Sequence, residues 1–516
     1  MSQPGRPPAL RAGEVGRAGS TEAAAIEQGA LPEPRARRSP WPGAVAVVAD
    51  DLTGAMDGGV QLLTQTAVEV LVSAGSGQRS ARVQTPPPAV DAPACIAQAA
   101  DAWVLPVINT QTRGMPPEEA AARFRALCRD VSAAGRTVWF KKIDSTLRGN
   151  VGAELAALHE ALAPCVIVCT PALPEEGRTV RGGALLVAGE PVMATPYRDE
   201  IPTAHGAAAS SAVIDIVRRQ WPECRAAHLP ARPSRSEIAA AAHGPVDLVV
   251  ADAASDRDLH ALAAAAEGAA RGGRRLVWAG AAGLLRALTL AGAPGVAAAP
   301  RAESGDPVGS REPAPPAPLV LVCGSRRSLS HRQVDLAAAA VRPLLVRASA
   351  ASGAAASKRW HVSGGAEDGA PGPLSAVDAA ALSAKALAAG RDLFLCAPSL
   401  AESAARPSVP VAETVAADLA DLAARALASA GVLPRALLLV GGDTAYACLR
   451  RLAIHRLELC GEVEPYVPWG RVLGGAWDGM VLVTKAGGFG DPDTLRRVSG
   501  FRPVASPPVR TVRSTP

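Results

Sequence analysis

The 516-residue sequence has few aromatic residues, little net charge and no long uninterrupted apolar segment. Phe, Trp and Tyr together make up 3% of the chain, and the formal net charge is +5. No block of Lys and Arg is interleaved with aromatic side chains, which argues against a nucleic-acid partner. No run reaches the roughly 18 strongly apolar residues of a membrane-spanning helix. The sequence therefore predicts neither a nucleic-acid partner nor a membrane association.

The sequence also lacks paired cysteines and a secretion signal. Its nine cysteines are scattered, odd in number and never spaced as C-x-x-C, so they form no zinc-ribbon pattern. Several lie within apolar runs, as small core residues in a reducing compartment do. The start of the chain holds no apolar segment of signal-peptide length. We therefore expect a cytoplasmic protein without disulfides, and we assign no residue to a metal site.

The chain has enough apolar material for more than one core, since hydrophobic residues make up 48% of its 516 residues. Stretches rich in Pro, Gly and charge interrupt this material without periodicity. Two of them, about 75–92 and 351–374, are predicted to be irregular surface loops. The others divide the chain into a disordered leader (1–42), a first domain (43–295), a linker (296–317), a second domain (318–505) and a loose tail (506–516).

Short apolar runs alternate with helical patterns in both predicted domains. In the first domain AVAVVA, VLPVIN, TVWFKK and PCVIVCT are each followed by a polar or glycine-rich turn. In the second domain the corresponding runs are PLVLVC, DLFLC, ALLLV and MVLVTK. Strands that alternate with helices pair in parallel through right-handed crossovers. The predicted fold class is α/β, with a mainly parallel sheet flanked by helices in each of two domains.

Two adjacent aspartates, Asp50 and Asp51, end the first predicted strand. Because an unpaired carboxylate is costly to bury, the chain is expected to leave the core there. Ligands of open α/β sheets bind at this carboxyl edge. Neighbouring residues of an extended chain point to opposite sides, so one carboxylate can face a ligand while the other caps the next helix. We expect Asp51 to be the cap and prefer Asp50 for the catalytic role.

Further charged residues follow the first domain's strands. Cations at strand ends suit a small anionic substrate, and arginine can bind a carboxylate through two nitrogens. Carboxylates suit proton abstraction or Mg²⁺ binding. The simpler alternatives are a surface charge for Lys141 and a salt bridge to Asp144 for Arg148. These strand-end residues include Asp57, Asn109, Arg113, Lys141, Lys142, Asp144, Arg148 and Asn150.

Glycine-rich turns follow several predicted strands, in TPALPEEGRTVRGG (170–183), VGGDTAY (440–446) and VTKAGG (483–488), and the hydroxyl-rich CGSRRSLS (323–330) follows another. A glycine-rich turn before a helix offers free backbone N–H groups and the positive end of the helix dipole to phosphate, although such turns also serve packing alone. The sequence contains no Walker loop, no complete dinucleotide fingerprint, no G-x-S-x-G and no H-E-x-x-H. Ordinary P-loop, dehydrogenase, hydrolase and metalloprotease sites are thereby disfavoured.

The motifs ADDLTGAMDGG, NTQTRG, KKIDSTLRGN, GSRRSLSHRQ, GGDTAYACLRRL and VTKAGGFGDPDTL, in this order, resemble the four-carbon acid sugar kinase family over about residues 44–500. The resemblance implies transfer of phosphate from ATP, with Mg²⁺, to threonate, erythronate or a 3-oxo-tetronate. It further implies that a substrate domain faces a nucleotide domain across a cleft. A sugar acid is the expected partner, and a homo-oligomer is left open, as are the acid, its stereochemistry and the hydroxyl phosphorylated.

The resemblance also implies the site residues. The substrate contacts would fall among Asp50, Asp51, Asp57, Arg113, Lys142, Asp144 and Arg148, and the strand-end position of Asp50 and Asp51 makes these two the expected catalytic residues. The nucleotide contacts would be Ser325, Ser328, Gly441, Gly442, Asp443, Thr444, Gly487 and Gly488. The chain departs from the family pattern at Arg326, Arg327, Asp443 and Gly488. A non-catalytic sensor of sugar acids, and a nicotinamide-dependent dehydrogenase, are the alternatives.

Overall fold

A computed structural model describes residues 44–63, 67–72, 104–201, 210–266, 269, 273–291, 317–349, 360–363, 373–398 and 409–502. They all belong to one compact unit, residues 40–516. The predicted leader and tail, the loop at 75–92 and all of the predicted linker except residue 317 lie outside the described residues. No helix among the described residues is long and apolar enough to cross a membrane.

A parallel sheet forms the centre of the N-terminal half. Its strands lie in the order β2-β3-β1-β4-β11-β5-β10-β9, and every neighbouring pair is parallel. The strands are β1 (Ala44–Ala49), β2 (Ala67–Leu71), β3 (Val104–Asn109), β4 (Arg136–Lys142), β5 (Cys165–Thr170), β9 (Ala226–Leu229), β10 (Leu248–Ala251) and β11 (Arg275–Gly280).

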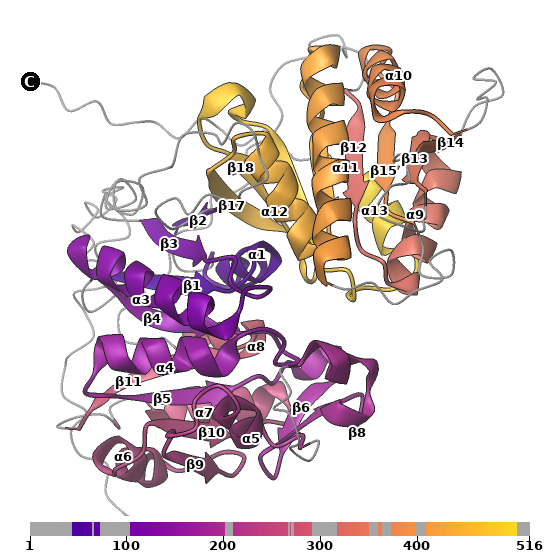
Figure 1. Ribbon diagram of the computed structural model, residues 1–516. Helices are drawn as coiled ribbons and strands as arrows, with labels where there is room; N and C mark the ends of the chain where they lie inside the picture. Colours follow the sequence, from indigo (N-terminus) through magenta and orange to yellow (C-terminus); the bar gives the residue numbers. More distant parts are fainter. Residues whose placement is uncertain are drawn as a thin grey trace, which may run out of the picture. The chain divides into compact units, whose positions relative to one another are not determined.

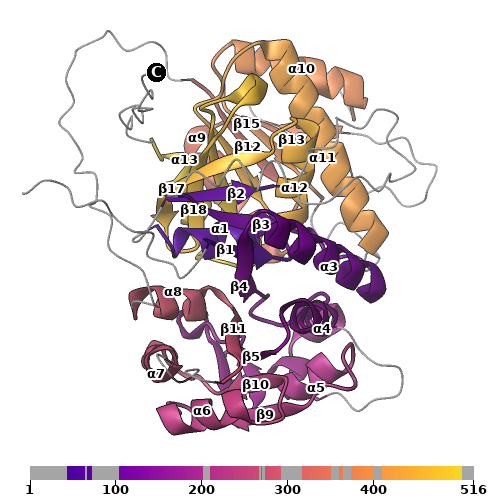
Figure 2. The same ribbon diagram turned by 90° about the vertical axis from the view of Figure 1, so that its left-hand side faces the viewer.

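Helices pack on both faces of this sheet, which is why its central strands are continuous apolar runs. In Figure 2, α4 and α5 lie on one side of β5, β10 and β11, and α7 and α8 lie on the other. Helix α3 packs against α4, and α7 against α8. The helices of this half are α1 (Leu52–Val60), α3 (Pro117–Ala133), α4 (Val151–Leu162), α5 (Val213–Arg218), α6 (Arg235–His243), α7 (Asp256–Ala266) and α8 (Ala282–Leu290).

A second, mainly parallel sheet forms the centre of the C-terminal half, in the order β14-β13-β15-β12-β16-β19-β18-β17. Strands β13, β15, β12, β16 and β19 are parallel, whereas β14, β18 and β17 pair in the antiparallel sense. The strands are β12 (Leu319–Cys323), β13 (Leu344–Ala348), β14 (Trp360–Ser363), β15 (Leu393–Cys396), β16 (Ala436–Val440), β17 (Arg456–Glu464), β18 (Val467–Val472) and β19 (Val481–Lys485).

Both faces of the C-terminal sheet are buried. Alternate residues of β12 belong to different apolar clusters: Leu321 packs with α9 and α13, whereas Val322 belongs to the cluster that includes α11 and α12. Figure 1 shows α11 and α12 on the opposite side of this sheet from α9 and α13. The helices are α9 (Ser328–Val341), α10 (Ala376–Ala388), α11 (Val409–Ala430), α12 (Gly442–Arg451) and α13 (Thr494–Ser499).

The two sheets are joined edge to edge. Strand β17 pairs antiparallel with β2, with Leu457 opposite Val70, and this pairing makes one sixteen-stranded sheet of the described strands. A salt bridge between Arg456 and Glu69 accompanies the pairing. The predicted α/β class is confirmed, and the structure adds the β17–β18 hairpin, which the sequence patterns did not predict.

Two local predictions were wrong. The glycine pair Gly182–Gly183 does not precede a helix but turns an antiparallel hairpin within a small separate sheet. That sheet consists of β6 (Arg178–Arg181), β7 (Ala184–Val187) and β8 (Glu190–Pro191). Part of the predicted loop at 351–374 is strand β14, which pairs with β13 at the sheet edge. Each strand is at most four residues long, too short for a periodic pattern to be distinctive.

The order of the strands places the predicted site residues. In the N-terminal half the chain passes from β3 on one side of β1 to β4 on the other, and in the C-terminal half from β15 on one side of β12 to β16 on the other. Ligands of open α/β sheets bind beyond the strand ends at such reversals. The segments after β1, β3 and β4 carry the charged motifs, and those after β12, β16 and β19 carry the glycine and serine motifs.

Candidate functional site

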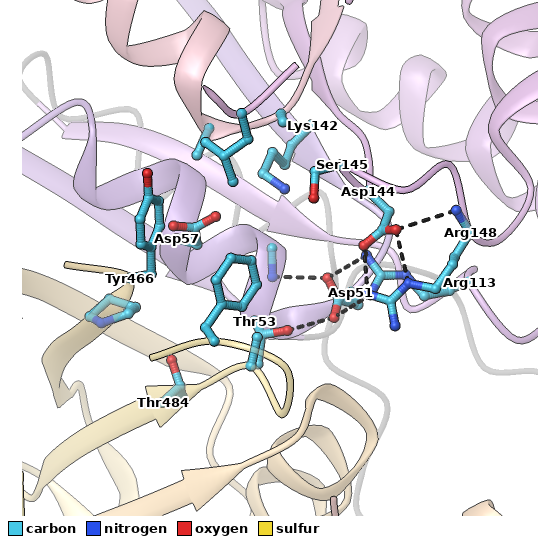
Figure 3. Close-up of a pocket in the computed structure, with 17 residues that line it drawn as sticks. Asp51, Thr53, Asp57, Arg113, Lys142, Asp144, Ser145, Arg148, Tyr466 and Thr484 are labelled. Carbon is cyan, nitrogen blue, oxygen red and sulfur yellow. Dashed lines mark hydrogen bonds and ion pairs between the residues drawn. The ribbon is translucent and has the colours of Figure 1, made fainter. Parts of the chain in front are cut away.

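A pocket of about 490 Å³, partly open to solvent, lies where these segments meet. Figure 3 shows that its polar lining comes largely from the segments after β1, β3 and β4. Its residues in the N-terminal half are Asp51, Thr53, Gly54, Asp57, Arg113, Lys142, Asp144, Ser145, Arg148, Leu173, Ala281 and Ala282. Its residues in the C-terminal half are Tyr466, Pro468, Thr484, Ala486 and Phe489.

Arg113 binds both adjacent aspartates. Its Nε and Nη2 donate to the two carboxylate oxygens of Asp50, at 2.8 and 3.1 Å. Its Nη1 and Nη2 donate to the two oxygens of Asp51, both at 2.9 Å. Burial by itself raises the pKa of Asp50, but Arg113 and Lys141 together hold that pKa below its usual value. Asp50 is therefore ionised at neutral pH.

The two aspartates have different positions. Asp51 caps α1, because its Oδ1 accepts from the Gly54 N–H at 2.8 Å, and it lines the pocket. Its Oδ2 also accepts from Thr53 Oγ1 at 2.6 Å. Asp50 is buried and is absent from the pocket lining. The structure thus agrees with the cap predicted for Asp51. It also places Asp51 at the pocket surface, whereas Asp50, the residue preferred for the catalytic role, does not line the pocket.

Asp57 and Lys142 form a second charged group in the pocket. The Asp57 Oδ1 atom is buried and has no hydrogen-bond partner among the described residues. Burial raises the pKa of Asp57 to about 6, although the nearby Lys142 opposes the shift. Lys142 is buried and donates from Nζ to the carbonyl of Ile143 at 3.1 Å. A buried lysine that donates to a carbonyl oxygen has further hydrogens for an anionic ligand.

Lys141 points away from this pocket. Its fully buried Nζ lies 2.7 Å from the Glu154 carboxylate, so the interpretation as a surface charge is wrong. Glu154 also accepts from Thr112, the residue before Arg113. Asn150 donates to the carbonyls of Thr112 and Met115, both at 2.8 Å. These contacts fix the loop that carries Arg113, a role that the sequence did not indicate.

Asp144 and Arg148 form the salt bridge that was the simpler alternative for Arg148. The Arg148 Nε and Nη2 atoms donate to Asp144 at 2.9 and 2.6 Å. Burial alone would raise the pKa of Asp144, but Arg148 and Arg113 hold it well below its usual value. The third nitrogen of Arg148, Nη1, donates to Glu200 at 3.1 Å. Arg148 also lines the pocket, so the salt bridge does not remove it from the site.

The serine and glycine turns of the C-terminal half meet one another. The backbone of Gly487 passes so close to Ser325 that a Cβ at position 487 would lie 2.2 Å from the serine Oγ. Ser330 Oγ connects them, because it donates to the Gly487 carbonyl at 2.7 Å and lies 2.8 Å from Ser325 Oγ, from which it can accept. The N–H of Gly441 donates to the backbone carbonyl of Lys485, which brings the turn after β16 to the end of β19.

The remaining predicted nucleotide contacts lie around these turns. Thr444 is buried, Asp443 is exposed at the start of α12, and Ser328 is exposed at the start of α9. Gly488 adjoins Arg327 and Tyr197, and a Cβ there would make ordinary contacts at 3.7 Å. The turn after β16 also reaches the N-terminal half. A Cβ at Gly442 would lie 2.5 Å from Oδ2 of Asp51 and 3.2 Å from Thr53 Oγ1.

Sequence reasoning missed the residues that complete the pocket from the C-terminal half. Tyr466 and Phe489 stack with their ring centroids 5.4 Å apart. The Tyr466 hydroxyl donates to Glu175, which also binds Arg286 at 2.6 Å. No local pattern distinguishes Tyr466, because its place depends on the β17–β18 turn.

Lys485, at the end of β19, was also missed. It is fully buried, and burial lowers its pKa to about 8. Its Nζ donates to the carbonyl of Ala486 at 2.9 Å. A lysine that ends the apolar run VLVTK was the only signal in the sequence.

The donor atoms available for a magnesium ion are few. The described residues contain no group of three or more His, Cys, Asp or Glu side chains arranged to hold a metal ion. Mg²⁺ bound with a nucleotide needs only one or two protein carboxylates, because phosphate and water supply the other ligands. Asp443 fits this role, since it is exposed beside the glycine turn and, among the residues that the structure describes, hydrogen-bonds only to the Gln111 side chain, at 3.3 Å.

Models of two protein families match the chain. The sugar-binding N-terminal domain matches residues 45–288, and the nucleotide-binding C-terminal domain matches residues 320–495. Solved structures of similar fold include a Salmonella typhimurium protein, 22% identical with a TM-score of 0.57, and a Haemophilus influenzae protein, 17% identical with a TM-score of 0.56. Each match covers 88% of this chain, together with 98% of the Salmonella chain and 99% of the Haemophilus chain.

Characterised relatives span nearly the whole chain. It is 32% identical to the D-threonate kinase of Bordetella bronchiseptica over 88% of this chain and 96% of that one. It is 28% identical to the D-erythronate kinase of Heliobacterium modesticaldum, with 87% and 94% covered. It is 29% identical to the 3-oxo-tetronate kinase of Methylobacterium radiotolerans, with 88% and 98% covered. Each of these relatives matches both halves of the chain, so the two halves belong together in one enzyme family.

Proposed function

The chain belongs to the four-carbon acid sugar kinase family, and from this membership we propose that it transfers the γ-phosphoryl group of ATP, bound with Mg²⁺, to a hydroxyl of a threonate, erythronate or 3-oxo-tetronate. The enzyme is a phosphotransferase of four-carbon sugar acids. The observation that supports the finer proposal best is the contact between Gly442 and Asp51. It brings a glycine turn suited to phosphate beside the charged pocket of the other half.

The proposed roles divide between the halves. Residues 43–295 hold the acid, with Lys142 as the cation for its carboxylate and Asp57 as an acceptor for its hydroxyl groups. Residues 318–505 hold the nucleotide, with the N–H groups at the start of α12 and the turns at Ser325 and Gly487 directed to its phosphates. Asp443 would hold Mg²⁺, which neutralises charge on the phosphates.

The proposed reaction forms one bond and breaks one. A hydroxyl oxygen of the acid attacks the γ-phosphorus, the bond from that phosphorus to the bridging oxygen breaks, and ADP leaves. The hydroxyl proton passes to a carboxylate. We assign this carboxylate to Asp51, because it lines the pocket beside Gly442, and we assign Asp50 to holding Arg113. Positioning and charge neutralisation supply most of the catalysis of phosphoryl transfer.

The test is ADP release across a panel of four-carbon acids, with NAD reduction followed in parallel. We expect ADP release that depends on one or a few of these acids. Binding of acid without ADP release would favour the sensor, and NAD reduction would favour the dehydrogenase. Cytoplasmic location stays a prediction; eight cysteines among the described residues are free. The oligomeric state also stays open.

A further inference from the structure

One side chain connects the predicted substrate side to the predicted nucleotide side. Glu200, in the 3-10 helix Pro196–Glu200, binds Arg148 through Oε2 at 3.1 Å and Arg327 through Oε1 at 2.8 Å. Arg148 follows β4 and lines the pocket, whereas Arg327 follows β12, two residues after Ser325. A carboxylate is thus held between one arginine from each half.

Both arginines are held in place without Glu200. Two nitrogens of Arg148 are bound to Asp144, which leaves Nη1 to reach Glu200. The guanidinium of Arg327 lies over the Tyr197 ring, 4.9 Å from its centroid. Its stem passes Gly488, where a Cβ would lie 3.7 Å from Cδ of Arg327. Because other groups position both guanidinium ions, the space between them remains suited to an anion when Glu200 leaves.

Glu200 is the weakest component of this group. Its side chain is 44% exposed, against 24% for Arg148 and 34% for Arg327. Partly exposed ion pairs contribute little to stability, so moving this carboxylate costs little. A phosphoryl group offers more negative charge and three oxygens, and arginine binds it through two nitrogens. A phosphate should therefore replace the Glu200 carboxylate.

We propose that Arg148 and Arg327 form a subsite for the transferred phosphoryl group, and that Glu200 occupies this subsite until the nucleotide binds. The proposal rests on the proposed function, because it takes ATP as the source of the phosphoryl group. It gives Arg327, where the chain departs from its family, a role in recognising the γ-phosphate. The ligand class is a terminal phosphate of a nucleoside triphosphate.

Titration calorimetry of ATP and ADP with the full chain tests the subsite. Arg327→Gln should raise the Kd of ATP about tenfold, as expected for loss of a charge-assisted hydrogen bond, and change the Kd of ADP less than twofold. Glu200→Gln should lower the Kd of ATP several-fold. Arg332→Gln is the matched control, since it removes an exposed charge from the same helix. It should change neither Kd.

Two results would overturn the subsite. Equal weakening of ATP and ADP by Arg327→Gln would place Arg327 on the diphosphate. Weaker ATP binding in Glu200→Gln would show that Glu200 is a structural link between the halves. If the wild-type chain bound neither nucleotide, the proposed function would fail, and inorganic phosphate would then decide the subsite. Glu200→Gln should bind inorganic phosphate more tightly than the wild type, and equal affinities would refute the proposal.

Discussion

Gly442, at the start of α12, lies directly against the carboxylate of Asp51, the residue that caps α1. A Cβ at position 442 would stand 2.5 Å from Oδ2 of Asp51, closer than real Cβ atoms approach other atoms. Two helix N-termini, one from each half of the chain, therefore meet at one carboxylate. The absence of a side chain at 442 is what permits this approach, and the first prediction follows from it.

Gly442→Ala should separate the two helix ends. Asp51 cannot easily move aside, because Gly54, Thr53 and Arg113 all donate to its oxygens. We expect kcat to fall about tenfold or more, since small displacements of reacting groups are costly. Steady-state ADP release measures this effect, and Gly58→Ala in α1, where a Cβ would make only ordinary contacts at 3.6 Å, is a control for loss of a glycine. Unchanged kcat in Gly442→Ala would mean that the contact is not needed for catalysis.

Asp51→Asn and Asp50→Asn should have different effects. Asp51 lines the pocket, so its replacement should lower kcat by about two to four orders of magnitude, while stability changes little because asparagine caps a helix as well as aspartate does. Asp50 lies behind Arg113, so its replacement should mainly reduce stability, by about 1–3 kcal/mol. Urea denaturation and ADP release measure the two effects. Near wild-type rates in both variants would make the aspartates structural.

Asp57 should make stability depend on pH. Its pKa is raised to about 6, above the value near 3.9 of an unfolded chain. The native state then holds the proton more tightly, so the stability from this group is present at about pH 4 and is lost as the pH rises through about 6. Asp57→Asn should therefore raise the free energy of unfolding at pH 7.5, by up to about 3 kcal/mol, and change it little near pH 4.

Urea denaturation of the wild type and Asp57→Asn at both pH values tests this expectation. Asp378→Asn, a change at an exposed carboxylate on α10, is the control and should behave alike at both. The same gain in stability at pH 4 and pH 7.5 would show that the effect of Asp57→Asn does not come from its titration.

Lys142→Gln should weaken binding of the acid. Lys142 is buried at the pocket, and among the described residues its Nζ donates a hydrogen bond only to a backbone carbonyl, so its charge is available to a substrate carboxylate. We expect the KM of the acid to rise at least about tenfold, because a charge-assisted contact is lost, while the Kd of ADP stays the same. Lys385→Gln, at an exposed position of α10, controls for charge. A rise in the Kd of ADP instead would move Lys142 to the nucleotide.

The sequence by itself determined the α/β class and the segments that carry the site. Runs such as AVAVVA and ALLLV are apolar throughout because their strands are buried on both faces, and a polar or glycine turn must follow where each strand leaves the core. The role of Asp51 as a helix cap could also be predicted from the sequence, because a cap depends on neighbours only three residues away.

Only the tertiary structure decided how the segments meet. The pairing of β17 with β2, the stacking of Tyr466 on Phe489 and the contacts of Glu200 with Arg148 and Arg327 join residues far apart in the chain. No local period encodes which strand edges pair or which turn faces which pocket. Asp50 illustrates the limit. Its place at a strand end was predicted from the sequence, but only the structure shows that it is buried against Arg113, 63 residues away, whereas Asp51 lines the pocket. Such contacts depend on the packing of the whole fold, because burial and charge pairing are properties of neighbours in space.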